Sequence, residues 1–238
     1  TNDDAAKACF SKGEGWHMLT AAEWGLLADT SLMLGTLPHG NTNGGKYHSD
    51  PAEHGEEYDN SSKTLTGSGP ATWTHDHTPE GVHDLCCNVW EMVRGLRIKN
   101  GRLQAAENND AALDIDLTQE GDGWKPIYND DGESIAVSVS GEEITICTAT
   151  EIEQDYTGTE WENVIIDFES EQLKELALFP GEPEAYFYVD STDGEYFPIR
   201  GGRWIHGAYA GVFSTSLSYS RAYVGRGIGF RSAYFKKN

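Results

Sequence analysis

Hydrophobic and polar residues alternate with a period of two through much of segment 100–196, as is typical of β-strands with one buried face. The segments 135–139 and 143–147 both alternate in this way, and the Ser-Gly-Glu sequence between them predicts a β-hairpin. The segments 164–168 and 185–189 are further predicted strands. The middle of the chain is therefore expected to be rich in β-structure.

Helical periodicity occurs in two places. Thr20 and Glu23 have the spacing of a capping box, and the apolar residues that follow recur at helical spacing. This pattern predicts a helix over residues 21–29, extended as far as Leu34. A second short helix is predicted over residues 170–179, ended by the Pro-Gly pair that follows it.

Irregular structure is expected between these elements. Residues 35–72 are rich in Gly, Asn, Ser and His, and a loop of this length in a compact domain is usually functional or structurally unusual. Residues 73–98 form a denser block, in which Val89, Trp90, Met92 and Val93 make an apolar cluster. No internal repeat is visible.

Composition limits the classes of function. The chain has 238 residues, of which 38% are hydrophobic, enough for one large domain with a buried core. Its formal net charge of −22 excludes a general nucleic-acid binder, which needs a basic surface. No apolar run reaches the roughly 18 residues of a membrane-spanning helix. No charged start followed by an apolar stretch precedes Cys9, so no signal peptide is visible in this chain.

The charge is unevenly distributed. Residues 199–238 contain no Asp or Glu, and their basic residues are Arg200, Arg203, Arg221, Arg226, Arg231, Lys236 and Lys237. Such asymmetry between regions indicates function. Arginines that only neutralise the acidic remainder of the fold would, however, give the same distribution of charge.

The four cysteines, Cys9, Cys86, Cys87 and Cys147, are expected to be free thiols. Adjacent cysteines rarely bond to each other because the resulting ring is strained. The absence of a C-x-x-C motif argues against structural zinc.

Segment 200–231 combines aromatic residues with Ser, Gly, Ala and Arg. Antibody-like binding surfaces share this composition, because Tyr supplies contact area at low entropic cost while Ser and Gly adapt. A Gly- and Tyr-rich strand at a sheet edge would have the same composition. Composition alone leaves both interpretations open.

Several motifs are more specific. At the carboxyl end, residues 200–213 read R-G-G-R-W-I-H-G-A-Y-A-G-V-F and residues 228–231 read I-G-F-R; upstream, residues 64–70 read T-L-T-G-S-G-P, residues 73–78 read W-T-H-D-H-T and residues 84–91 read D-L-C-C-N-V-W-E. Together these motifs resemble the variable (target) proteins of diversity-generating retroelements, in the formylglycine-generating-enzyme-like (sulfatase-modifying factor) branch of the C-type lectin fold. The resemblance covers roughly residues 13–110 and 196–235.

The resemblance implies an α+β fold class: one C-type lectin-like domain over residues 1–238. Residues 101–196 would form a β-rich acidic insertion or subdomain, and residues 200–231 the variable region. In such systems a reverse transcriptase acts on the gene, not on the protein, and misincorporates bases at adenines of a template. The positions then open to change, called here the candidate positions, are Arg203, Ile205, His206, Ala208, Tyr209, Ser214, Ser216, Ser218, Tyr219, Ser220, Ala222, Tyr223, Val224, Gly225, Arg226 and Gly227. None is Trp, Met, Lys, Glu or Gln, the types that this mutagenesis of Asn codons does not reach.

The function implied by the resemblance is non-catalytic recognition of a receptor. The partner would be a macromolecule, expected to be a protein because the candidate positions mix Tyr, Arg, Ile and Val. The expected place is a virion surface or an extracellular or cell surface, with no nucleic-acid partner and no membrane insertion.

Two alternatives come from related folds. A formylglycine-generating-enzyme-like oxidoreductase would need a C-terminal cysteine pair for copper, and residues 188–238 contain no cysteine. A calcium-dependent carbohydrate-binding lectin would carry a Glu-Pro-Asn or Gln-Pro-Asp loop, and neither occurs. The chain is therefore expected to be no enzyme and to have no catalytic residues.

No metal ligand or cofactor is assigned. His75, His77, His83 and Asp84 could form a ligand set, but a polar loop that hydrogen-bonds its own backbone explains them as well. Asn108, Asn109, Asp110, Asp114 and Asp116 could bind calcium through oxygen, without the spacing of an EF-hand.

The resemblance also predicts a division of labour within residues 200–231. Trp204, Ala210, Val212, Phe213, Leu217, Ile228 and Phe230 should be buried and fix the backbone, while the candidate positions point outward. Arg200, Arg221 and Arg231 should pair with buried carboxylates or carbonyls such as those of Glu91. Cys87 stands where the family usually has Gly, which raises the question of how the turn forms.

Overall fold

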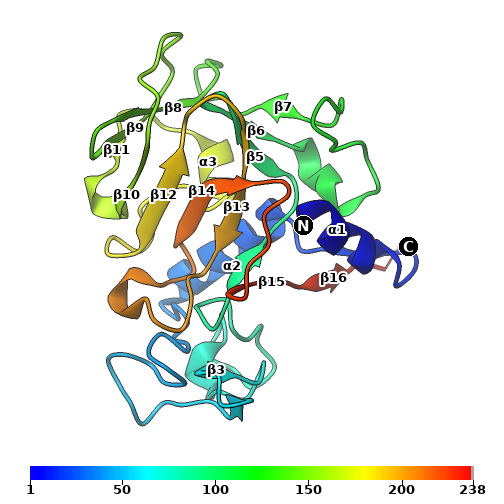
Figure 1. Cartoon of the computed structure of the whole chain (residues 1–238), viewed down its shortest axis with the longest axis vertical. Helices are drawn as coiled ribbons and strands as arrows, with labels where there is room; N and C mark the ends of the chain where they lie inside the picture. Colours follow the sequence, from blue (N-terminus) through cyan, green and yellow to red (C-terminus); the bar gives the residue numbers. More distant parts are fainter. Residues whose placement is uncertain (237–238) are drawn as a thin grey trace.

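The structure is a computed structural model of the whole chain, and it describes residues 1–236. The fold mixes α and β structure: one large curled β-sheet carries most of the strands, and helices are few. Figure 1 shows the sheet in the upper half of the molecule and the loop-rich segment 35–72 below it. The expectation of a mixed α and β fold is confirmed at this level.

The large sheet has twelve strands. They are β4 (Trp90–Met92), β5 (Leu96–Lys99), β6 (Arg102–Ala105), β7 (Lys125–Pro126), β8 (Ala136–Ser140), β9 (Glu143–Cys147), β10 (Tyr156–Glu160), β11 (Ile165–Ile166), β12 (Tyr186–Asp190), β13 (Glu195–Arg200), β14 (Thr215–Ser220) and β15 (Ile228–Phe230). Its main path runs β10-β12-β14-β13-β5-β6-β8-β9-β11, with β4 joining β13 to β15 and β7 pairing with β6. The sheet curls so far that β10, at one edge, contacts β9 near the other.

Two small sheets complete the β-structure. The strand β1 (Trp16–Met18) pairs with β16 (Ser232–Tyr234), so segments far apart in the sequence lie side by side. The strands β2 (Glu57–Tyr58) and β3 (Lys63–Thr64) form a short hairpin within the loop-rich segment.

The helices are α1 (Asn2–Phe10), α2 (Ala21–Leu34) and α3 (Glu171–Glu175), with short 3-10 helices at 71–73, 107–112, 161–163 and 207–209. The predicted helix from residue 21 to Leu34 is confirmed. Thr20 accepts a hydrogen bond from the Glu23 backbone N–H, and the Glu23 carboxylate accepts one from the Thr20 N–H, which completes the capping box.

The middle of the chain agrees with the sequence in part. The β8–β9 hairpin is confirmed, and so is the strand predicted over 185–189, although β12 begins and ends one residue later, at Tyr186 and Asp190. The strand predicted over 164–168 is only two residues long, because β11 pairs with two residues of β9 and no more. The helix predicted over 170–179 ends at Glu175, because Ala177 takes a positive φ of 48°. The carbonyls of Leu173 and Lys174 accept hydrogen bonds from the turn that follows.

Residues 101–196 supply β6 to β12 to the same sheet that contains β13 and β14. The main core lies between this sheet and α2 and α3, and it includes Trp24, Val93, Leu96, Ile98, Ile144, Trp161, Leu178, Phe187, Val212, Phe213 and Leu217. Helix α2 packs so closely on α3 that a Cβ atom at Gly25 would lie 2.0 Å from the Glu175 carbonyl oxygen. Any larger residue at this position would force the helices apart.

Candidate functional site

The backbone of segment 200–231 is held by residues from distant parts of the chain. The Gly44 N–H donates to the Trp204 carbonyl at 2.8 Å, and the Gly207 N–H donates to the Thr42 carbonyl at 3.0 Å. Further along, the Trp90 N–H donates to the carbonyl of Gly227 at 2.9 Å. The loops between the strands of this segment are therefore attached to fixed parts of the fold at several points.

Two buried indoles fix the centre of the segment. Trp24 donates its ring N–H to the Val212 carbonyl at 2.8 Å, and Trp161 donates to the Phe213 carbonyl at 2.9 Å. All four side chains are fully buried. The Phe213 carbonyl also accepts from Thr215 Oγ1 at 3.0 Å. Because buried carbonyls need hydrogen-bond partners, these bonds set the position of the chain between Gly211 and β14.

A carboxylate from the acidic region completes this anchor. The Phe213 backbone N–H donates to Glu182 Oε2 at 3.0 Å. Burial raises the pKa of Glu182 to about 7, although its hydrogen bonds from the Phe213 and Val212 backbone act in the opposite direction. The carboxylate lies directly over Gly211, where an added Cβ would come within 2.3 Å of Oε2, so a larger residue there would displace the carboxylate.

Arg200 and Arg231 have the structural role that the sequence predicts. Arg200 is fully buried and donates to the carbonyls of Leu176 and Ala177, at 2.6 and 3.2 Å. Arg231 forms a two-point ion pair with Glu91 and also donates to the backbone carbonyls of His83 and Asp84. Both ends of segment 200–231 are thereby fixed by guanidinium groups.

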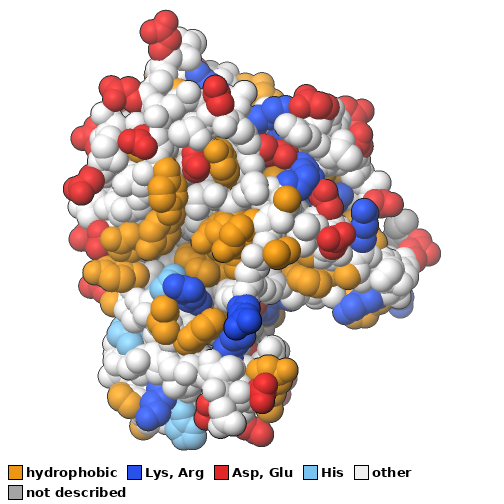
Figure 2. Space-filling view, viewed as in Figure 1, with side chains coloured by type: hydrophobic (Ala, Val, Ile, Leu, Met, Phe, Trp, Pro, Cys, Tyr) orange, Lys and Arg blue, Asp and Glu red, His pale blue; other side chains and the backbone are white. Residues whose placement is uncertain are grey.

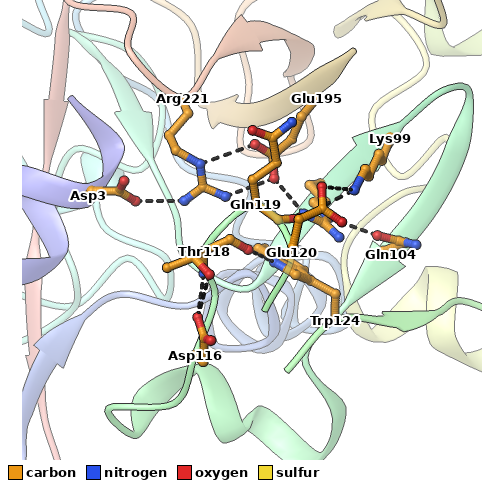
Figure 3. Close-up of polar contacts among 11 residues, drawn as sticks. Asp3, Lys99, Gln104, Asp116, Thr118, Gln119, Glu120, Trp124, Glu195 and Arg221 are labelled. Atoms are coloured by element: carbon orange, nitrogen blue, oxygen red, sulfur yellow. Dashed lines mark hydrogen bonds and ion pairs between the residues drawn. The ribbon is translucent and has the colours of Figure 1, made fainter. Parts of the chain in front are cut away.

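Arg221, just after β14, belongs to a second ion-pair network. Its guanidinium lies between Glu195 of β13 and Asp3 of α1 (Figure 3). The N···O distances are 2.8 Å to Glu195 and 2.7 Å to Asp3. Glu195 also pairs with Arg97 at 2.5 Å, and the Glu195 and Arg97 side chains are almost completely buried. This network attaches the end of β14 to the amino-terminal helix.

Most of the candidate positions lie on the outside of this framework. The exposed ones are Ile205, Ala208, Tyr209, Ser220, Ala222, Tyr223, Val224, Gly225 and Arg226, and the half-buried ones are Arg203, His206, Ser218, Tyr219 and Gly227. The exposed fractions of Ile205, Tyr209 and Val224 are 59%, 49% and 66%. The rings of Tyr219 and Tyr223 lie 4.3 Å apart, and Tyr209 packs edge-on against Tyr186 of β12.

Ser214 and Ser216 do not follow the expectation. Both are buried, because Ser214 precedes β14 directly and Ser216 lies within it, in the middle of the sheet. Ser214 Oγ donates to the Tyr209 carbonyl at 2.6 Å and so braces the loop from inside. The prediction that these two side chains point outward is wrong.

The predicted anchors are buried only in part. Val212, Phe213 and Leu217 are fully buried, whereas Trp204, Ala210 and Ile228 are half-buried. Phe230 is 45% exposed, so its predicted burial is wrong. The reason is the position of β15, which pairs with the short strand β4 away from the main core. Lys63 Nζ lies over the Trp204 ring, 5.2 Å from the ring centroid, in a cation–π contact.

The candidate positions surround a pocket of about 420 Å³. Its walls are mostly aromatic and basic: they include Trp90, Tyr156, Tyr188, Arg203, Trp204, His206, Tyr219, Tyr223 and Arg226. Figure 2 shows hydrophobic side chains gathered over β12 and β14 with Lys and Arg beside them, while Asp and Glu gather over the outer loops. None of the lining residues in the described part of the chain is Asp or Glu.

The pocket is partly desolvated. Burial, together with the charge of Arg203, lowers the pKa of His206 to about 4, so this histidine is neutral at pH 7 and its Nε2 accepts from Arg203 Nε at 3.3 Å. Burial also raises the pKa of Tyr188 to about 12. The positive charge of the pocket therefore comes from Arg203 and Arg226.

Several of the candidate metal ligands hydrogen-bond within the fold. His75 Nδ1 accepts from the Val82 N–H at 3.0 Å, and Asp84 accepts from the Gly67 N–H at 2.8 Å. Asn109 bonds to the capping residues of α2, and Asp116 bonds to Thr118. Across residues 1–236, no group of three or more His, Cys, Asp or Glu is arranged to hold a metal ion.

The cysteines are free thiols, and three of them are buried. Cys87 takes the left-handed backbone conformation itself, with φ of 66°, so the turn forms without glycine at this position. Its Sγ donates to the Arg203 carbonyl at 3.3 Å, which adds a further support beneath the loop. Burial raises the pKa of the Cys87 thiol, which stays protonated.

Sequence reasoning missed several residues that build this site. Trp161, Glu182, Tyr156 and Tyr188 all come from the acidic region between residues 101 and 196, and Glu195 begins β13. No motif marks them, and their roles depend on the parallel pairing of β12 with β14, which brings the two regions together.

Comparisons with known proteins assign no family: no protein-family model matches the chain, and no curated protein matches it either. None of the helices in the part of the chain that the structure describes is long and apolar enough to cross a membrane. The function proposed below therefore depends on the motifs of the sequence and on the geometry of residues 200–231.

Proposed function

We propose that this chain is a non-catalytic binding protein of the diversity-generating retroelement class, with a C-type lectin-like fold of the formylglycine-generating-enzyme-like branch. Its binding surface consists of the exposed candidate positions between Arg203 and Gly227. Its partner is a macromolecule, and we favour a protein. The chain itself would act at a virion surface or at an extracellular or cell surface. The sequence motifs at 200–213 and 228–231 are the basis for the family.

One structural observation carries the proposal: exposed side chains project from a backbone that other parts of the fold hold fixed. Tyr209 and Tyr223 are exposed, while Val212, Phe213 and Arg200 between or beside them are completely buried. A preorganised backbone lowers the ordering cost of binding. Exposed positions also accept substitution at about 0.5 kcal/mol or less, so diversity does not unfold the domain.

The rival activities gain no specific support. Copper-dependent oxidation would need cysteines in the C-terminal segment, and none is present between residues 188 and 238. The pocket walls are aromatic and basic rather than rich in oxygen ligands for calcium.

The proposal can be tested with two displayed libraries of this chain. The first randomises Ile205, Ala208, Tyr209, Tyr223 and Val224, and the matched control randomises exposed residues of the β8–β9 hairpin, such as Ser140, Glu142 and Glu143. Both are selected against several unrelated folded proteins. We expect folded, specific binders from the first library and none from the control. Equal yields from both libraries, or loss of folding in the first, would contradict the proposal.

A further inference from the structure

The walls of the pocket come from two different parts of the chain. Tyr219, Tyr223 and Arg226 belong to the variable region, whereas Tyr156 of β10 and Tyr188 of β12 lie outside residues 200–231. Tyr156 is exposed and Tyr188 is half-buried. A ligand in this pocket would therefore contact two tyrosines that diversification of residues 200–231 does not change.

The two arginines of the pocket differ from the framework arginines. Arg200, Arg221 and Arg231 are bonded to carbonyls or carboxylates of the fold. Within residues 1–236, Arg226 makes no hydrogen bond or ion pair, and the Arg203 side chain bonds only to the neutral His206. Both guanidinium groups thus keep their capacity to pair with an anion from outside.

The charge of the whole protein sharpens this contrast. A net charge of −22 repels acidic molecules from most of the surface. At an ionic strength of about 0.1 M, however, charges more than roughly 10 Å apart are largely screened, so the nearest groups decide what binds. In the pocket these nearest charged groups are Arg203 and Arg226.

We propose that the pocket binds an acidic loop or peptide segment of a protein, with a carboxylate between Arg203 and Arg226 and an apolar side chain against Tyr156 and Tyr188. This inference rests on the proposed function and names the chemistry of its target. Arg pairs with carboxylates at two points, and tyrosine rings offer apolar contact at low entropic cost. Aromatic and Arg side chains also bind single-stranded nucleic acids, whose bases stack on them. The test must therefore distinguish an acidic peptide from a nucleic acid.

The test is selection of a random cyclic-peptide library on the intact, unmodified chain. The strongest peptides are then measured against Tyr223→Ala, against Arg203→Gln with Arg226→Gln, and against Tyr156→Ala. Lys174→Gln and Tyr58→Ala are matched controls, since neither residue lines the pocket. Arg226→Gln alone is measured as well, because this exposed, unpaired side chain can change without loss of folding.

We expect selected peptides enriched in Asp and Glu together with apolar residues, despite the acidity of the protein. Their affinity should fall at least about tenfold in the arginine and Tyr156 variants, and several-fold between about 0.05 and 0.5 M salt. The control variants should bind unchanged, and an oligothymidylate should not compete.

Two kinds of failure can be told apart. If peptides bind through Tyr223 but are not acidic, or ignore Tyr156, or are displaced by the oligothymidylate, the inference fails and the proposed function stands. If selection yields no peptide that depends on Tyr223, both fail.

Discussion

The indole N–H of Trp161 donates a hydrogen bond to the backbone carbonyl of Phe213 at 2.9 Å, and both side chains are completely buried. Trp161 also stacks on Phe187 of β12, with ring centroids 4.3 Å apart. The acidic region thereby forms part of the floor on which the candidate binding surface lies.

Substitution of Trp161 should reveal this role. Trp161→Phe keeps most of the packing but removes one of the two donors to the Phe213 carbonyl, which Thr215 Oγ1 still reaches at 3.0 Å. We therefore expect a loss of about 0.5–1.5 kcal/mol in the free energy of unfolding. Trp161→Ala should lose about 3–5 kcal/mol. Denaturant unfolding measures both, with Tyr156→Phe as an exposed control that should change by less than about 0.5 kcal/mol. A Trp161→Phe variant as stable as the parent would refute the role of the hydrogen bond.

Ser214 and Ser220 offer a matched pair for the tolerance of the candidate positions. Ser214 is fully buried beside β14 and Ser220 is exposed at its end. Ser214→Tyr should cost about 1–3 kcal/mol through overpacking, while Ser220→Tyr should be nearly neutral. Thermal unfolding of the two variants decides the point, and equal melting temperatures would show that burial does not limit diversity here.

Exposed aromatic and basic residues should contribute little to stability. The combined variant Tyr209→Ala, Tyr223→Ala and Arg226→Ala should lose less than about 1.5 kcal/mol in the free energy of unfolding, because each site is exposed. Phe213→Ala should lose about 3–5 kcal/mol, since its ring is buried. A combined variant less stable than Phe213→Ala would mean that these side chains are part of the core.

Glu182 should make stability depend on pH. Its pKa of about 7 in the folded state lies above its ordinary value of 4.5, so the folded state holds this proton more tightly than the unfolded one. The contribution of this proton to the free energy of unfolding is complete below pH 4.5 and is lost as pH rises through 7. At 1.36 kcal/mol per pKa unit, the loss amounts to roughly 3 kcal/mol.

The measurement is the free energy of unfolding between pH 5 and 8 for the parent, Glu182→Gln and the exposed control Glu184→Gln. The glutamine at 182 still accepts from the Phe213 N–H but has no proton to lose. The free energy of unfolding of Glu182→Gln should therefore change less with pH than that of the parent. The free energy of unfolding of Glu184→Gln should change with pH as the parent's does. Parallel curves for all three proteins would show that Glu182 does not titrate in this range.

Local patterns predicted the local elements well. The capping box at Thr20 and Glu23 and the alternation around Gly141 depend on neighbours in sequence, and both α2 and the β8–β9 hairpin follow from them. The motif at 200–213 likewise identified Arg200 and Phe213 as buried framework residues.

Long-range relationships could not be predicted in this way. The burial of Ser216 and the exposure of Phe230 depend on which strands β14 and β15 pair with, and no local pattern encodes that pairing. The contributions of Glu182 and Tyr188 have the same origin, because they reach the site through the pairing of β12 with β14. Sequence therefore located the site, and the tertiary fold decided which side chains form it.

The central claim is that the exposed positions between Arg203 and Gly227 are diversified while the framework beneath them stays fixed. Sequencing the DNA around the gene, together with many copies of the gene from one population, tests it most directly. We expect a near-copy of the codons for residues 200–231 with adenines at the candidate positions, and variation confined to those codons. Absence of such a copy, or variation that falls equally on the codons of Val212, Phe213 and Leu217, would contradict the account.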